Sequence, residues 1–128
     1  MKTFKAWLLV AVIWVLIVTT LHCLPGSRLP KISWQDKIFL DKWIHFFLFL
    51  LLVFLWSRFY SNKRSIAGVK KIFLTITILS MIYGIGMEVV QHYFIPFRSF
   101  AYEDIVADGL GSAAGYFISI KRFVKKPI

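Results

Sequence analysis

The sequence predicts an all-α integral membrane protein, a bundle of four transmembrane helices that forms one domain over residues 1–128. Hydrophobic residues make up 59% of the chain and charged residues only 17%, which leaves too little polar surface for a soluble domain of this size. Basic residues give a net charge of +10. They flank the apolar runs and do not form the basic face typical of nucleic-acid binding, so we expect no nucleic-acid partner.

The first helix is expected at about residues 4–23. Its core, residues 6–21, contains no charged residue, and a Leu-Pro-Gly turn at residues 24–26 ends it. Lys2 and Lys5 resemble the start of a signal peptide. No small-residue cleavage site follows, so we expect this helix to be retained.

The other three helices are expected at about residues 42–60, 69–93 and 103–122. Each uncharged core is shorter than the roughly 20 residues that cross a bilayer, so each helix must extend into its polar flanks. The extensions bring a set of polar residues into the helices near one membrane boundary. These are Asp41, His45, Glu88, Gln91, Asp104 and Asp108.

The distribution of basic residues predicts the orientation. Most of them lie at the N-terminus, in the loop at residues 58–71 and in the tail after Ile120. The positive-inside rule then places both termini in the cytoplasm. All 6 acidic residues and all 3 histidines come to lie on the outer side.

Small residues indicate that the polar face is also a packed face. Gly84 precedes Glu88 by one helical turn, and Gly111-x-x-x-Gly115 follows Asp108. Such residues let neighbouring helices approach closely, so we expect one polar pocket inside the bundle. Asp41 and Asp104 are placed to cap helices, but Asp108 lies a full turn deeper. The expected ligand-binding residues are Asp41, His45, Glu88, Gln91, Arg98, Asp104 and Asp108.

The chemistry of this pocket is open between several roles. Arg98 either closes a salt bridge with Glu88 or Asp104 or grips a phosphate, because a guanidinium suits both partners. Catalysis is the less favoured alternative, with Glu88 or Asp108 as base and His45 assisting. We expect no cofactor and no metal site, because no two histidines are paired along the chain. A divalent ion held by carboxylates and histidines of different helices is the weaker alternative.

Several short motifs follow one another along the chain after the first helix. They are Leu24-Pro25-Gly26, Leu29-Pro30, Asp41-Lys42-Trp43-Ile44-His45-Phe46-Phe47, Gly84, Glu88-Val89-Val90-Gln91, Pro96-Phe97-Arg98, Asp104, Asp108-Gly109-Leu110-Gly111 and Gly115. Taken in order, these motifs resemble the VanZ-like family of small bacterial membrane proteins. One departure is Asp108, which stands where the family often has asparagine.

The resemblance implies a multi-pass protein of the bacterial cytoplasmic membrane, in a family whose named member is associated with low-level resistance to teicoplanin, a lipid-tailed glycopeptide. The leading hypothesis is a non-enzymatic cell-envelope protein among membrane lipids. Its pocket is expected to bind an anionic lipid, a lipid-linked cell-wall precursor or a lipoglycopeptide. The alternatives are a hydrolase acting on a lipid-linked phosphate, and a purely structural polar cluster in a protein that binds partners.

Overall fold

A computed structural model describes residues 2–23, 40–61, 66–95 and 102–124. These ranges form four α-helices and contain no strand, which confirms the predicted all-α class. Each helix begins and ends within about three residues of its expected bounds. The helices are α1 (Lys2–His22), α3 (Leu40–Tyr60), α4 (Ile66–Phe94) and α5 (Tyr102–Phe123).

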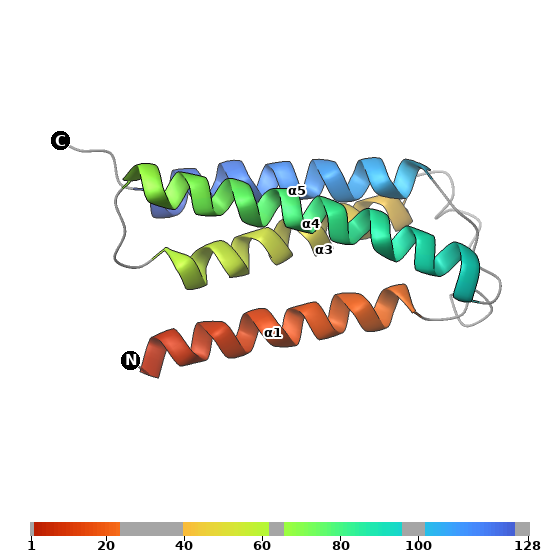
Figure 1. Ribbon diagram of the computed structural model, residues 1–128, viewed down its shortest axis with the longest axis horizontal. Helices are drawn as coiled ribbons and strands as arrows, with labels where there is room; N and C mark the ends of the chain where they lie inside the picture. Colours follow the sequence, from red (N-terminus) through yellow and green to blue (C-terminus); the bar gives the residue numbers. More distant parts are fainter. Residues whose placement is uncertain (1, 24–39, 62–65, 96–101, 125–128) are drawn as a thin grey trace.

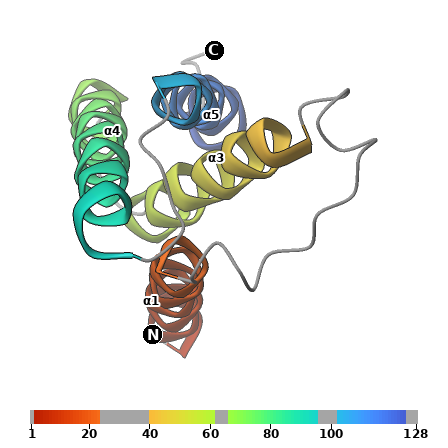
Figure 2. The same cartoon turned by 90° about the vertical axis from the view of Figure 1, so that its right-hand side faces the viewer.

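The four helices lie roughly along one axis (Figure 1). Viewed from the end, α3 lies between α1 on one side and α5 on the other, with α4 beside them (Figure 2). Helix α3 contacts each of the other three helices, whereas α1 has little contact with α4. Helices α1 and α4 end where α3 and α5 begin. We call this the polar end, because His22, His45, Gln91 and Asp104 lie there.

The distribution of polarity is the reverse of that in a soluble protein. Leu16 and Phe117 are 60% and 68% exposed, whereas Glu88 and Asp108 are 0% and 1% exposed. Three helical segments are long and apolar enough to cross a membrane: Lys5–His22, Lys42–Tyr60 and Gly68–Phe94. Helix α5 is not among them, because it carries Asp108 and charges at both ends. These features support a membrane protein, while the crossing by α5 and the orientation of the termini stay predictions.

The closest approach between helices is that of α5 to α3. A Cβ atom added at Gly111 would lie 2.1 Å from the carbonyl oxygen of Phe46, and one added at Gly115 would lie 2.7 Å from that of Leu50. The backbones therefore touch where only glycine fits, as the small-residue pattern predicts. This contact fixes which residues of α5 face the first turns of α3.

Helix α1 is tied to the rest of the bundle by a few specific contacts. Val18 packs with Phe49 and Leu52 in the buried apolar core. The indole Nε1 of Trp14 donates a hydrogen bond to the carbonyl oxygen of Leu48 at 3.0 Å. Further along α1, the hydroxyl of Thr19 is hydrogen-bonded to that of Tyr83 on α4.

We predict that Gly111→Ala destabilises the protein, while Gly109→Ala does not. The added methyl group at position 111 collides with backbone, and overpacking of this kind costs about 1–3 kcal/mol. Nothing lies within 4 Å of a Cβ at Gly109. Gly109→Ala should therefore raise the free energy of unfolding by about 0.5–1 kcal/mol, because alanine lowers the backbone entropy of the unfolded chain. Thermal unfolding of both variants in the same detergent measures the difference. Equal melting temperatures would contradict the close α3–α5 contact.

Candidate functional site

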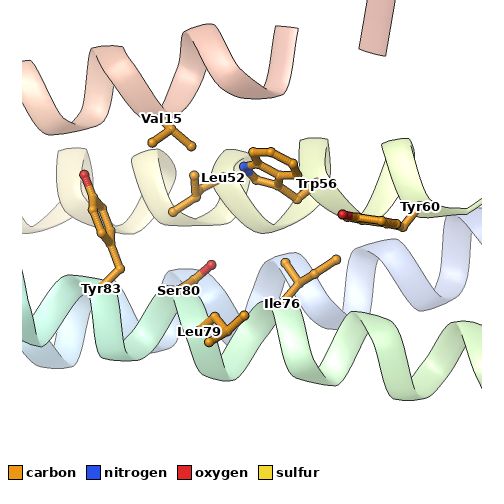
Figure 3. Close-up of a pocket in the computed structure, with 8 residues that line it drawn as sticks. All are labelled: Val15, Leu52, Trp56, Tyr60, Ile76, Leu79, Ser80 and Tyr83. Atoms are coloured by element: carbon orange, nitrogen blue, oxygen red, sulfur yellow. The ribbon is translucent and has the colours of Figure 1, made fainter. Parts of the chain in front are cut away.

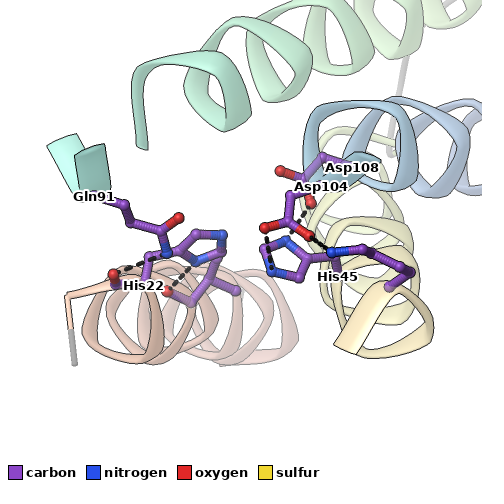
Figure 4. Close-up of polar contacts among 7 residues, drawn as sticks. His22, His45, Gln91, Asp104 and Asp108 are labelled. Atoms are coloured by element: carbon purple, nitrogen blue, oxygen red, sulfur yellow. Dashed lines mark hydrogen bonds and ion pairs between the residues drawn. The ribbon is translucent and has the colours of Figure 1, made fainter. Parts of the chain in front are cut away.

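The polar residues of four helices meet at the polar end (Figure 4). Lys42 and His45 are three residues apart on α3, and Asp104 and Asp108 are four apart on α5, so each pair shares one face of its helix. The packing of Gly111 against Phe46 brings these two faces together. The short spacings within each helix thus become contacts between helices.

The pairs form a continuous chain of charged and polar contacts. The Lys42 Nζ donates to Asp104 Oδ1 at 2.7 Å. The second carboxylate oxygen of Asp104, Oδ2, lies 3.8 Å from His45 Nε2. On the other edge of the same ring, His45 Nδ1 lies 2.8 Å from Asp108 Oδ1. His45 therefore lies between two carboxylates, and its two nitrogens face different ones.

Asp108 is enclosed on every side. Its side chain is 2% exposed, and a Cβ atom added at Gly84 would lie 3.0 Å from its Oδ2. The lack of a side chain at Gly84 therefore makes room for this carboxylate between α4 and α5. Among the described residues, Oδ2 has no hydrogen-bond partner, so one oxygen of this deeply buried carboxylate lacks the partner that burial normally requires.

His22 is a site residue that the sequence analysis missed. It is 2% exposed at the end of α1, and its ring lies edge-on to that of His45 with centroids 5.0 Å apart. Its Nδ1 donates to the Val18 carbonyl oxygen at 2.8 Å, because a carbonyl can only accept. Gln91 Nε2 donates to the carbonyl oxygen of His22 at 3.0 Å. The only signal in the sequence was the expected outer position that His22 shares with the acidic residues.

The structure brings together most of the predicted site. His45 contacts both Asp104 and Asp108, and Gln91 is linked to His45 through His22. Glu88 is fully buried and near enough to His45 to interact with it electrostatically. Asp41 belongs to α3, but its side chain lies outside the described residues, as does the whole of Arg98. The roles predicted for Asp41 and Arg98 therefore stay predictions.

The balance of charge decides what this cluster can do. Three carboxylates, those of Glu88, Asp104 and Asp108, lie near one permanent cation, Lys42, among the described residues. Such a cluster favours cations and hydrogen-bond donors, since buried charges need partners. Imidazole and carboxylate groups are also common ligands of divalent transition metals.

A largely apolar groove lies between α1, α3 and α4, further along the helices from the polar end (Figure 3). Its volume is about 320 Å³, and Val15, Leu52, Trp56 and Leu79 are among the residues that line it. Tyr83 lines its end nearest to the polar residues. The Tyr83 ring packs on Phe49, and the ring of Phe49 packs in turn on that of His22. The groove and the polar cluster are therefore separated by two aromatic rings.

The comparisons with known proteins identify the family but not an activity. The family model described as VanZ/LLP1 matches residues 3–124. No curated protein and no solved structure in the comparisons matches the chain. The match spans nearly the whole sequence and confirms the resemblance found in its motifs, so this chain belongs to the VanZ/LLP1 family.

Proposed function

We propose that this protein binds an anionic amphiphile, with an acyl chain in the groove between α1, α3 and α4 and the head group at the polar end. The observation that carries the proposal is the adjacency of the two sites. A largely apolar groove reaches Tyr83, and the polar cluster begins two rings further on, at His22. An amphiphile likewise has an apolar chain that leads to a polar head group.

The groove supports an acyl chain as its occupant. It lies between helices that are apolar enough to cross a membrane, so lipid chains are the molecules that surround it. Lipid chains are as apolar as the groove, and moving one from the bilayer into it gains little free energy. The selectivity of binding must therefore come from the head group.

The expected orientation assigns the head group to the outer leaflet of a bacterial cytoplasmic membrane. The described carboxylates outnumber the described cations at the polar end, so an anionic head group needs a further positive charge. Arg98 is the proposed source, because a guanidinium binds phosphate or carboxylate through two parallel hydrogen bonds. The ligand classes that fit are an anionic phospholipid, a lipid-linked cell-wall precursor and a lipoglycopeptide of the teicoplanin type.

The groove is tested by a pair of matched variants. Leu79 and Ile82 are both on α4 and both 59% exposed, but only Leu79 lines the groove. Leu79→Trp should fill the groove and weaken lipid retention by roughly tenfold, which corresponds to about 1.4 kcal/mol. Ile82→Trp should retain lipid as the unmodified protein does. Native mass spectrometry of protein released from detergent measures the bound lipid. Loss of lipid from both variants, or from neither, would exclude the groove as the acyl site.

The head group is tested at Arg98. Arg98→Ala should weaken binding of the anionic ligand by about 10–100-fold, because a charge-assisted hydrogen bond is worth about 1.5–3 kcal/mol. Arg98→Lys should recover part of the affinity, since it keeps the charge but not the planar fork. Binding to vesicles with phosphatidylglycerol, to a lipid-linked precursor and to teicoplanin separates the three ligand classes. An Arg98→Ala protein that binds all three like the original would contradict the proposal.

A lipid-phosphate hydrolase is the second candidate, and the contact between His45 and Asp108 favours it. The two side chains are hydrogen-bonded at 2.8 Å in a buried place, as in an acid–base pair. This function predicts release of phosphate from a lipid-linked substrate, with a rate that falls by about 10²–10⁴-fold in His45→Ala. Absence of phosphate release from the intact protein would remove this candidate.

A further inference from the structure

We propose that His22, His45 and Asp108 form a binding site for a divalent transition-metal ion, Zn²⁺ being the type case. One donor atom from each residue lies within 4.8 Å of the other two. All three residues are buried, and they come from three different helices, α1, α3 and α5. The site neither requires nor follows from the binding of an amphiphile.

The ring nitrogens of the two histidines are arranged as in a metal site. A ligating histidine usually donates its second ring N–H to a carbonyl or carboxylate, which fixes the tautomer and the ring orientation. In His22, Nδ1 donates to the Val18 carbonyl oxygen at 2.8 Å, as the second nitrogen of a metal-bound histidine does, and Nε2 would be the ligand atom. The backbone of His22 is held in turn by Gln91.

His45 and Asp108 complete the ligand set. A metal that replaces the proton between His45 Nδ1 and Asp108 Oδ1 gains a nitrogen and an oxygen ligand, now 2.8 Å apart. The other nitrogen, Nε2, then carries the proton and faces Asp104 Oδ2 at 3.8 Å. Asp104 is itself held by Lys42 at 2.7 Å. Asp104 is thus a positioning residue, in the carboxylate–histidine–metal arrangement that supports many zinc sites.

The required movements are small. Ligand atoms around tetrahedral Zn²⁺ lie about 3.4 Å apart when each bond is about 2.0–2.1 Å. The contact between His45 and Asp108 must therefore widen slightly, and His22 must approach by on the order of 1 Å. The rings of His22 and His45 are 5.0 Å apart, which is a distance that a side-chain rotation can adjust.

The ligand set also indicates the kind of site. Two histidines and one carboxylate leave at least one coordination position open, as in catalytic rather than structural zinc centres. The second oxygen of Asp108, which has no hydrogen-bond partner among the described residues, offers a second contact to the ion. A divalent cation would also compensate the excess of carboxylates at the polar end, so that this end could attract an anionic group.

Metal binding is tested with the whole protein in detergent, free of any polyhistidine tag and stripped with EDTA. Addition of Co²⁺ should produce the visible absorption of a tetrahedral site at one ion per chain, and Zn²⁺ should abolish it. Asp104→Asn should weaken binding by about 10–100-fold, as loss of an outer-shell partner does. His22→Gln and Asp108→Asn should weaken it further.

The control separates this site from the third histidine of the chain. His92→Gln changes an exposed histidine of α4 and should leave the Co²⁺ titration unchanged. X-ray absorption of the Zn²⁺-loaded original protein gives a result that does not depend on the folding of any variant. Two imidazole ligands at about 2.0–2.1 Å support the site. Only oxygen ligands, no stoichiometric Co²⁺ binding, or a His22→Gln protein with unchanged affinity would overturn it.

Discussion

The contact between the backbones of α3 and α5 is the constraint on which the rest of the structure depends. In an apolar environment no hydrophobic force drives helices together, so close packing must supply the attraction. Gly111 and Gly115 allow α5 to rest on the carbonyl groups of Phe46 and Leu50. That approach sets the register in which Asp104 meets Lys42 and Asp108 meets His45. The two glycines of α5 therefore determine where Asp104 and Asp108 lie relative to α3.

The polar contacts add specificity to this packing. A carboxylate buried in an apolar bundle is costly unless it is paired, so alternative registers that separate Asp108 from His45 are disfavoured. Gly84 contributes by giving the Asp108 carboxylate space against α4. The same residues thus select one arrangement of three helices and build the cluster. For this reason, variants at Asp108 or Gly84 should be assessed for folding as well as for ligand binding.

Much of the fold could be predicted from the sequence, because apolar runs and turn residues are local signals. The helix bounds, the packing role of Gly111 and Gly115, and the inward face of Asp108 all follow from spacing along one helix. The site was predicted less completely, since contacts between helices depend on register and rotation. His22 is 23 residues before His45 along the chain, so no spacing rule pairs their rings. Lys42 likewise had several acidic residues as possible partners, and only the packing of α5 selects Asp104.

The placement of His22 on α1 has a thermodynamic consequence. Helix α1 forms one wall of the groove through Val15 and contributes one ring to the polar cluster through His22. A metal ion that bridges His22 to His45 would hold the end of α1 against α3. An acyl chain bound beside Val15 would contact the same helix. If binding at either site orders these shared helices, occupancy of one site changes the affinity of the other, and linkage makes the two effects equal. Both sites are built in part from α1 and α3, so the coupling free energy between them is a measurable property of the protein.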